Sequence, residues 1–500
     1  MRSAPAQSST AQSVLRRWLH PGDTSLAIAT RAGDGWSELT YGELDLMSAA
    51  MADALAGAGV GPGDPVALLA EPGGDWAGAF LGIVRAGAVA VLLDAKLTDE
   101  ELAPLCRRSH LAAAVVAPSH APRWPDRSIP VLAPSITATA GATDRPEASR
   151  AADDPAVLVW TSGTTGAPKG VTLSLANLAY VVERSSQVQA TGPEERWLSV
   201  LPPNHLLELC CGLLPALAAG STTFVARTIV PGDLWSMIGS CRVNRMVVVP
   251  MVLRLLRRHL EPVAASGGFS AGSMQAIYCG GAALDEEMVK FFAELGIGVY
   301  QGYGLTEAAP VVAMNTPDRN RAGSVGPPLP GTSVRVAGNG EILVKGPGVM
   351  LGYWDDGAAT REAVDAEGWL HTGDLGHVDG DGYLYVTGRS KSLIVLENGK
   401  KVQPEEVETV LSRGERFAEV CVVGRRSTNG SEQVCAVVVA VDGTSMSQEE
   451  ANDEVRRQSA SLSGFKRPTI VHVHDGPLPR TAKRSLRRDA VVRLLEVDAT

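Results

Sequence analysis

Apolar residues recur in short blocks along much of the chain, separated by longer stretches in which they return at helical spacing. Residues 44–56 and 76–85 follow the helical pattern and predict helices with one apolar face. Short uninterrupted apolar runs predict buried strands, and their alternation with helices predicts the layered, largely parallel sheets of an α/β fold. The expected strands are 66–69, 88–93, 113–117, 157–160, 222–226 and 245–249.

The pattern changes after Pro327, where short apolar runs are separated by Gly-rich turns. Strands expected at 334–336, 340–344 and 382–386 indicate a small antiparallel β lobe. Beyond Arg389 the order becomes strand, helix, strand, strand, which predicts a small α+β domain. Its expected elements are 393–396, 404–411, 418–424 and 434–441.

These patterns predict three segments of different character. We expect a disordered tail at 1–13, because these residues are rich in Ser, Ala and Gln. A large α/β domain that carries the β lobe is expected at 14–388, and the small domain at 389–500.

Composition narrows the class of protein. The 500 residues are 45% hydrophobic and 20% charged, as in ordinary globular proteins, and the net charge of −10 argues against a nucleic-acid partner. Seven cysteines without CxxC spacing favour a reducing compartment. Because neither a signal peptide nor a membrane-spanning apolar run is recognisable, we expect a cytoplasmic protein.

Residues 161–170 carry the strongest chemical signal, the string Thr-Ser-Gly-Thr-Thr-Gly-Ala-Pro-Lys-Gly directly after the strand at 157–160. Such a loop can wrap its N–H and O–H groups around an anion, and its lysine adds a positive charge. The spacing differs from that of a Walker A loop. The alternative is a flexible Ser/Thr/Gly loop. The predicted ATP-binding residues are Thr161, Ser162, Gly163, Thr164, Thr165, Gly166 and Lys169.

This string resembles the phosphate loop of the AMP-forming adenylating enzymes, which include acyl- and aryl-CoA synthetases, peptide-synthetase adenylation domains and luciferases. The resemblance extends over nearly the whole chain, and residues 393–401 are most similar in texture to fatty and long-chain acyl-CoA synthetases. It implies that ATP and Mg²⁺ activate an acid, most simply a carboxylic acid, with release of pyrophosphate. The implied acceptor is a small molecule, above all the thiol of CoA. Further matching segments follow in order at 301–307, 352–354, 368–374, 388–391 and 404–408.

Individual residues in these segments suit parts of ATP. Tyr303, in a Gly-flanked turn, can stack on a purine, and Thr306 can donate to the α-phosphate. Glu307 is a hard oxygen ligand for Mg²⁺, although an acid at the start of a helix would look the same. Asp374 suits capture of the ribose hydroxyls, with an Asx-turn as the alternative.

Other roles come from the resemblance alone. Gly281 and Ala282 would line the adenine and acyl pocket. Arg389 would contact the ribose. Lys391 would be the hinge, in a junction at 389–391, about which a mobile C-terminal domain rotates. Gly399 would let the pantetheine thiol of CoA approach.

His205 matches the position that closes the carboxylate pocket in this family, although a lone histidine is often structural. It follows the segment Leu-Pro-Pro-Asn at 201–204. We count it among the predicted catalytic residues, together with Thr306 and Glu307.

The family pattern breaks near the C-terminus. At 479–488 the sequence reads Pro-Arg-Thr-Ala-Lys-Arg-Ser-Leu-Arg-Arg, and an ungapped match puts Ser485 where the family has its catalytic lysine. Lys483 or Arg484 could supply the missing charge, and Lys483 is the predicted catalytic cation. Alternatively the enzyme adenylates an unusual acid, such as nitrite for transfer to an aryl amine in the diazo-forming branch. A third alternative is a nucleotide-binding protein that has lost turnover.

Overall fold

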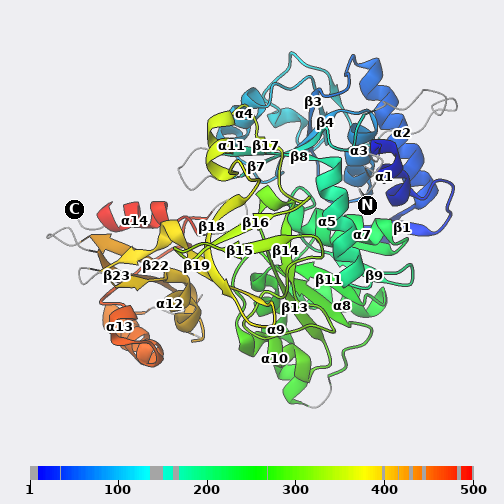
Figure 1. The fold of residues 1–500 in the computed structure, drawn as a ribbon. Coiled ribbons are helices and arrows are strands. Elements are labelled where there is room, and N and C mark those ends of the chain that lie inside the picture. The colour runs from blue at the N-terminus through cyan, green and yellow to red at the C-terminus, as the bar shows by residue number, and fades with distance from the viewer. Residues whose placement is uncertain are drawn as a thin grey trace, which may run out of the picture. The chain divides into compact units, whose positions relative to one another are not determined.

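The computed structural model describes residues 10–33, 35–135, 150–161, 168–266, 269–396, 400–414, 416–426, 432–441, 446–480 and 486–497. The chain divides into two compact units (Figure 1). The N-terminal unit comprises Met1–Val334 and Val344–His371, and the C-terminal unit comprises Arg335–Leu343 and Thr372–Thr500. The domain boundary expected at 388 from the sequence remains a prediction.

A seven-stranded sheet in the N-terminal unit has the order β17-β8-β7-β4-β3-β5-β6. The strands from β7 to β6 run parallel, whereas β8 pairs antiparallel with both β7 and β17. Alternate side chains of each strand point to the same face of the sheet. On one face these side chains pack against Leu102 and Leu105 of α4. The strands are β3 (Pro65–Leu69), β4 (Val89–Leu92), β5 (Ala113–Val116), β6 (Val131–Leu132), β7 (Pro155–Thr161), β8 (Lys169–Ser174) and β17 (Gly352–Tyr353).

An eight-stranded sheet in the same unit has the order β14-β13-β12-β11-β9-β10-β1-β2. Its central pairs, from β13 to β1, are parallel, and the two edge pairs are antiparallel. The strands are β1 (Leu26–Ala32), β2 (Gly35–Thr40), β9 (Arg196–Ser199), β10 (Thr222–Val225), β11 (Arg245–Val248), β12 (Ala276–Cys279), β13 (Gly298–Gly304) and β14 (Val311–Met314).

Helices surround these two sheets. Several begin with a capping box. In α2, the Thr40 hydroxyl oxygen accepts from the Glu43 N–H, and the Glu43 carboxylate accepts from the Thr40 N–H. None of the described helices is long and apolar enough to cross a membrane. The helices are α1 (Ala11–Leu19), α2 (Tyr41–Gly57), α3 (Gly74–Arg85), α4 (Asp99–Arg108), α5 (Leu175–Val188), α6 (Leu206–Glu208), α7 (Leu214–Ala218), α8 (Pro231–Ser240), α9 (Pro250–Ala265), α10 (Glu286–Glu294) and α11 (Gly357–Ala363).

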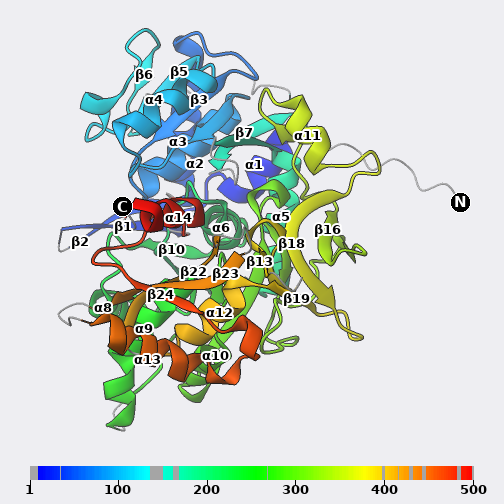
Figure 2. The same cartoon turned by 90° about the vertical axis from the view of Figure 1, so that its left-hand side faces the viewer.

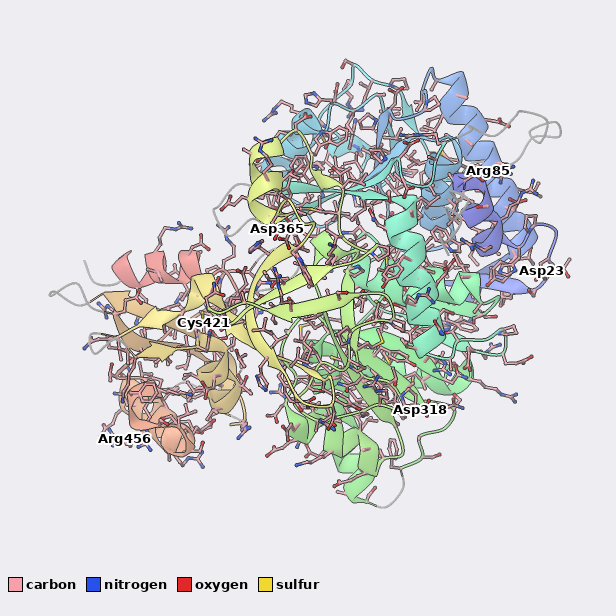
Figure 3. All side chains as sticks on the ribbon, in the orientation of Figure 1. Asp23, Arg85, Asp318, Asp365, Cys421 and Arg456 are labelled. Carbon is pink, nitrogen blue, oxygen red and sulfur yellow. The ribbon has the colours of Figure 1, made fainter. Side chains whose placement is uncertain are left out.

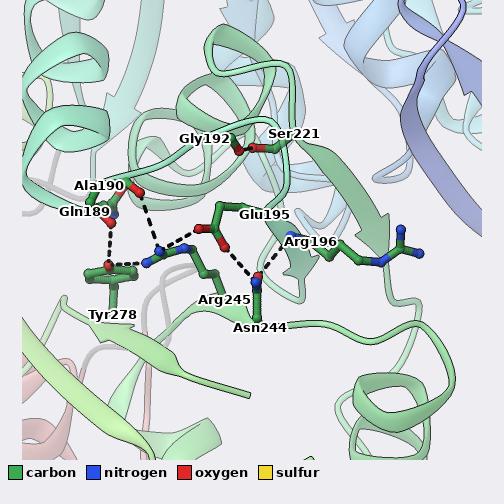
Figure 4. Close-up of polar contacts among 9 residues, drawn as sticks. All are labelled: Gln189, Ala190, Gly192, Glu195, Arg196, Ser221, Asn244, Arg245 and Tyr278. Atoms are coloured by element: carbon green, nitrogen blue, oxygen red, sulfur yellow. Dashed lines mark hydrogen bonds and ion pairs between the residues drawn. The ribbon is translucent and has the colours of Figure 1, made fainter. Parts of the chain in front are cut away.

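A buried polar network fixes the amino ends of β9 and β11 (Figure 4). The Arg245 guanidinium donates to Glu195 Oε1 at 2.9 Å and to the Tyr278 hydroxyl at 3.0 Å. Asn244 Nδ2 donates to the other oxygen of Glu195 at 2.6 Å. Because these charges are paired and hydrogen-bonded, the network stabilises this end of the sheet. The candidate site lies at the opposite end, where the strands finish.

In the described part of the C-terminal unit, small sheets pack with the α-helices α12, α13 and α14 (Figure 2). The four-stranded sheet β15-β16-β18-β19 contains the antiparallel pair β18–β19, and the three-stranded sheet β22-β23-β24 packs on α12 and α13. All seven cysteines of the chain are buried thiols, Cys421 of this unit among them (Figure 3).

The layered α/β fold with a small β lobe and a C-terminal α+β unit is confirmed. The elements of the lobe and the C-terminal unit are β15 (Ser333–Val336), β16 (Glu341–Lys345), β18 (Leu370–Val378), β19 (Leu384–Arg389), β20 (Ile394–Val395), β21 (Lys401–Val402), α12 (Pro404–Leu411), β22 (Phe417–Arg426), β23 (Glu432–Ala440), α13 (Gln448–Gln458), β24 (Ile470–Val473) and α14 (Arg488–Val497).

Candidate active site

The predicted phosphate loop is the connection of the β7–β8 hairpin. Thr161 faces Lys169 across this hairpin, and its Oγ1 donates to the Lys169 carbonyl oxygen at 3.2 Å. Arg108 holds both ends: its guanidinium donates to the Pro168 carbonyl oxygen at 2.7 Å and lies 4.5 Å from the centre of the Trp160 ring. The base of the loop is therefore well fixed. Ser162, Gly163, Thr164, Thr165 and Gly166 lie outside the described residues.

The Glu307 carboxylate meets a tyrosine from the next matching segment of the chain. Tyr353 Oη donates to Glu307 Oε1 at 3.0 Å, and the Lys169 ammonium lies 4.7 Å from the centre of the Tyr353 ring. Burial, followed by the neighbouring Glu307 charge, raises the pKa of Tyr353, so the hydroxyl stays protonated as a donor. The structure thus brings Glu307 and Lys169, two predicted ATP-site residues, to opposite parts of one tyrosine side chain.

The turn before Glu307 requires a close backbone approach. A Cβ added to Gly304 would overlap the carbonyl oxygen of Pro310, so only glycine fits there. Thr306 is buried, with 8% of its surface exposed, and Tyr303 is half-buried in β13 opposite Ala313. The segment 301–307 is therefore the end of β13 followed by a 3₁₀ turn at Thr306–Ala308, and Tyr303 lies in a strand instead of the turn that its flanking glycines predicted.

His205 is paired with an acid that follows β4. Its Nε2 lies 3.3 Å from Asp94 Oδ2. Burial alone would raise the pKa of Asp94, but the contact with His205 and the Lys96 amide, which donates at 2.8 Å, lower it overall. His205 follows β9 of the eight-stranded sheet and Asp94 follows β4 of the seven-stranded sheet, so the carboxyl ends of strands from both sheets meet here. Ligands of parallel α/β sheets bind at such edges.

Gly281 and Ala282 lie just beyond the carboxyl end of β12 and are exposed. Gly281 has a φ of 85°, a left-handed conformation that favours glycine. A Cβ on the preceding Gly280 would lie 3.3 Å from Leu207 Cδ1, on the helical segment after His205. This edge is thus lined by small residues opposite an apolar helix.

In the C-terminal unit, Asp374 and Arg389 face each other across β18 and β19. Arg389 Nε lies 2.9 Å from Asp374 Oδ1, with the aspartate side chain 4% exposed and the arginine side chain 55% exposed. The structure therefore joins the two predicted ribose ligands. Lys391 lies in a 3₁₀ turn, Ser390–Ser392, that follows directly, and its side chain is not described. Gly399 lies outside the described residues.

Residues 481–485, including Lys483, also lie outside the described residues, but both flanks are anchored in the C-terminal unit. Arg480 forms a β-bridge with Leu486, and its guanidinium lies 3.2 Å from Glu419 Oε2. Arg488 lies 2.6 Å from Glu408 Oε2. The five-residue connection therefore begins and ends at fixed points.

The donor set fits Mg²⁺ that arrives with a nucleotide. No cluster of three His, Cys, Asp or Glu side chains that could enclose a metal ion occurs in the described part of the chain. Tyr353 occupies Glu307 Oε1, and among the described residues no hydrogen-bond donor reaches Oε2. Mg²⁺ keeps several waters and commonly binds one or two carboxylates plus phosphate oxygens. A single open carboxylate oxygen suits that coordination.

Two residues of this site were missed by inspection of the sequence. Tyr353 belongs to the Gly-Tyr-Trp match at 352–354, but no role followed for it because its partners are distant in sequence. Asp94 directly follows the strand expected at 88–93, a position that could have identified it as a residue of the carboxyl edge. No local signal indicated that it would meet His205.

Two family profiles match the chain. The profile of the AMP-binding enzyme matches residues 18–354, and that of the AMP-binding enzyme C-terminal domain matches residues 406–484. A feruloyl-CoA synthase from Amycolatopsis sp is 33% identical over 487 residues, which are 93% of this chain and 96% of that protein. An indoleacetate–CoA ligase from Aromatoleum aromaticum is 35% identical over 353 residues, 68% of this chain and 67% of that protein.

Solved structures show the same similarity. ATP-bound MatB from Rhodopseudomonas palustris superposes with a TM-score of 0.85 at 28% identity, and the match covers 98% of this chain and 100% of that one. The similarity therefore extends over nearly the whole chain.

Proposed function

Because the chain belongs to the AMP-binding enzyme family, we propose that it activates an apolar carboxylic acid with ATP and transfers the acyl group to CoA. Activation of an acid with ATP and Mg²⁺ is the chemistry of this family, and the names of the relatives, a feruloyl-CoA synthase and an indoleacetate–CoA ligase, indicate CoA as the acceptor. The observation that carries the proposal is the group Glu307, Tyr353 and Lys169 beside the phosphate-loop hairpin.

In the first step, an oxygen of the acid attacks the α-phosphorus of ATP, and the bond to the leaving pyrophosphate breaks. We propose that residues 161–166 and Lys169 hold the phosphates, while Thr306 donates to the α-phosphate. Mg²⁺ bound at Glu307 would neutralise charge on the phosphate oxygens. Tyr303, Gly281 and Ala282 would contact the adenine, by the family match.

The acid would enter beside His205. The Asp94 carboxylate contacts Nε2 of this imidazole, and the contact orients the ring at the edge where the two sheets meet. The helical segment that follows His205 is apolar on the side of Leu207, which faces Gly280. These contacts support an apolar acid, and the aryl acids named for the relatives are the first to test.

In the second step, the CoA thiolate attacks the acyl carbon and AMP leaves. Family resemblance assigns ribose contacts to Asp374 and Arg389, the hinge to Lys391 and the thiol channel to Gly399. Lys483 is proposed as the cation that assists adenylation, because Ser485 occupies the lysine position. The ion pair of Arg488 with Glu408 supports the ungapped match, since it gives the last arginine of that pattern a fixed place.

A screen of pyrophosphate release tests the proposal. Ferulate, indoleacetate, a long-chain fatty acid and nitrite are each supplied with MgATP, with and without CoA. We expect release with an apolar acid and a CoA-dependent thioester by mass spectrometry, and neither with the Glu307→Ala variant. Release with nitrite alone would favour the diazo-forming alternative, and ATP binding without any release would favour a protein without turnover. None of the relatives described above supports these two alternatives.

A further inference from the structure

Tyr353 stands between two charged groups that are proposed to bind different parts of MgATP. Its hydroxyl donates to Glu307 Oε1 at 3.0 Å, and its ring face lies under the Lys169 ammonium at 4.7 Å. The two charges belong to segments more than a hundred residues apart in the chain. One side chain thus contacts both the predicted metal ligand and the predicted phosphate cation.

The backbone holds Tyr353 firmly in this position. Tyr353 pairs with Val171 of β8, and the Trp354 N–H donates to the Gly170 carbonyl oxygen at 2.7 Å. The Tyr353 N–H donates to Thr360 Oγ1 at 2.9 Å, which ties the strand to α11. Since β8 begins at Lys169, the tyrosine and the lysine share one scaffold.

The backbone on the other side of Glu307 is fixed by the same segment. The Met350 N–H donates to the Glu307 carbonyl oxygen at 2.9 Å. Asn177 Nδ2 donates to the carbonyl oxygens of Pro347 and Val349, at 2.7 and 3.1 Å, which anchors the approach to Met350. Glu307 is therefore held through both its main chain and its carboxylate.

We propose that Tyr353 is a positioning residue that orients the Glu307 carboxylate for Mg²⁺ and at the same time holds the Lys169 ammonium for the phosphates. The hydroxyl donates to Oε1 and fixes the carboxylate, so that Oε2 would remain available to the metal. Groups that hydrogen-bond a metal ligand in this way commonly contribute 10- to 100-fold to metal affinity. The inference rests on the proposed metal role of Glu307.

The two halves of the tyrosine can be separated by substitution. Tyr353→Phe removes the hydroxyl group and keeps the ring, whereas Tyr353→Leu removes both. Tyr180→Phe is the matched control, because the Tyr180 hydroxyl also donates to an oxygen acceptor, here the Pro330 carbonyl at 2.9 Å, and a cation also lies over its ring, with the Arg184 guanidinium 5.9 Å from the ring centre. Tyr353→Trp keeps an aromatic face and an N–H donor. It replaces Tyr353→Phe in the Mn²⁺-binding test if the phenylalanine variant does not fold.

The readouts are Mn²⁺ binding in the presence of ATP, followed by electron paramagnetic resonance, and ATP binding by calorimetry with excess EDTA. We expect Tyr353→Phe to weaken Mn²⁺ binding about 10-fold and to leave metal-free ATP affinity unchanged. Tyr353→Leu should weaken both, and Tyr180→Phe neither. In turnover assays, Tyr353→Phe should raise the Mg²⁺ concentration that gives half-maximal rate by a larger factor than the factor by which it lowers kcat.

Wild-type Mn²⁺ affinity in Tyr353→Phe, or an equal loss in Tyr180→Phe, would overturn the inference. If the phenylalanine variant does not fold, Mn²⁺ binding by Tyr353→Trp as weak as by Tyr353→Leu would overturn it instead. The Glu307→Gln variant distinguishes failure of the proposed metal role of Glu307 from failure of the proposed role of Tyr353. If it binds Mn²⁺ as wild type does, Glu307 is not the metal ligand and the proposed function itself needs revision. If it loses Mn²⁺ while Tyr353→Phe does not, only the role of Tyr353 fails.

Discussion

Glu208 is a carboxyl group buried in the N-terminal unit, three residues after His205. Its side chain is 1% exposed, and a Cβ on Gly212 would lie 2.9 Å from its Oε1. Burial raises its pKa from 4.5 to about 8, although contacts with Ser199 and the Leu201 backbone partly offset the effect. The folded protein therefore holds this group protonated at neutral pH, because a buried charge without a counter-ion is costly.

The sign of the resulting pH dependence follows from the two states. Between pH 4.5 and about 8 the unfolded chain carries a carboxylate while the folded chain retains the proton. Unfolding then releases a proton, so the free energy of unfolding falls as the pH rises, by up to about 1.4 kcal/mol per pH unit.

Glu208→Gln should remove this dependence, since the amide keeps the shape and cannot ionise. We expect its free energy of unfolding at pH 8 to exceed that of wild type by a few kcal/mol. This is about the stability that wild type loses between pH 4.5 and pH 8. Urea unfolding at pH 5, 6.5 and 8 measures it, with the exposed Glu367→Gln as the control that should retain the wild-type slope. An unchanged slope in Glu208→Gln would mean that the carboxylate is accommodated in the fold.

At the scale of elements, the site depends on turns that bring main chains unusually close. Gly304 ends β13, and an added Cβ would meet backbone atoms of Pro310 and Val311 that have no side-chain freedom to move away. This turn sets the direction in which the chain leaves the sheet for Thr306 and Glu307. A substitution here should therefore act on stability and on the site together.

Gly304→Ala is expected to destabilise the protein by roughly 1–3 kcal/mol, as overpacking typically does, and to lower the adenylation rate at least 10-fold. Gly239→Ala is the control: it lies in α8, nothing is within 4 Å of the added Cβ, and alanine should stabilise the helix by about 0.5–1 kcal/mol. Urea unfolding and acid-dependent pyrophosphate release give the two readouts. A Gly304→Ala protein as stable and active as wild type would show that the turn can relax.

Sequence patterns predict local elements well and their long-range pairing poorly. The helix expected at 404–411 coincides with α12, because Pro404 at its first position and the apolar spacing are local signals. The π-helix Leu209–Leu213 was not predicted, since it reads like ordinary apolar helix. The pairing of β17 with β8 could not be predicted either, because two residues of a strand carry no periodicity.

At the scale of the whole molecule, the predicted site residues divide between the two units. Glu307, Lys169 and His205 belong to the N-terminal unit, whereas Asp374 and Arg389 belong to the C-terminal unit. Family resemblance predicted this set from short motifs. The motifs contain Tyr353 but do not show that it contacts Glu307, and they do not show that Asp94 contacts His205, because tertiary packing makes both contacts.

The proposed hinge at Lys391 makes the two half-reactions separable. Lys391→Pro should stall rotation, because proline fixes φ. Adenylate formation should then survive while transfer to CoA falls by an order of magnitude or more. Single-turnover assays of each step, with Lys391→Ala as the control that keeps backbone freedom, measure the effect. Equal loss of both steps in the proline variant would count against a hinge at this residue.

The proposed replacement of the family lysine by Lys483 concerns the first half-reaction. The connection 481–485 begins and ends at anchored residues, since Arg480 bridges to Leu486 within the C-terminal unit. Lys483 is its middle residue. A cation two residues from the usual position, on a short connection with fixed ends, is the simplest replacement for the charge that the family lysine supplies.

Lys483→Ala should therefore lower adenylation by about 10²–10³-fold, the loss typical when one charged partner of a transition state is removed. Transfer from preformed adenylate should be spared, because the cation is needed only while charge develops on the α-phosphate. Ser485→Lys should match or exceed wild type with a carboxylic acid, since it restores the family residue. The measurement is acid-dependent pyrophosphate release, with Lys466→Ala as the control, whose ammonium is already paired with Glu406 at 2.7 Å. If Lys483→Ala is as fast as wild type, the replacement is not Lys483, and Arg484→Ala becomes the decisive variant.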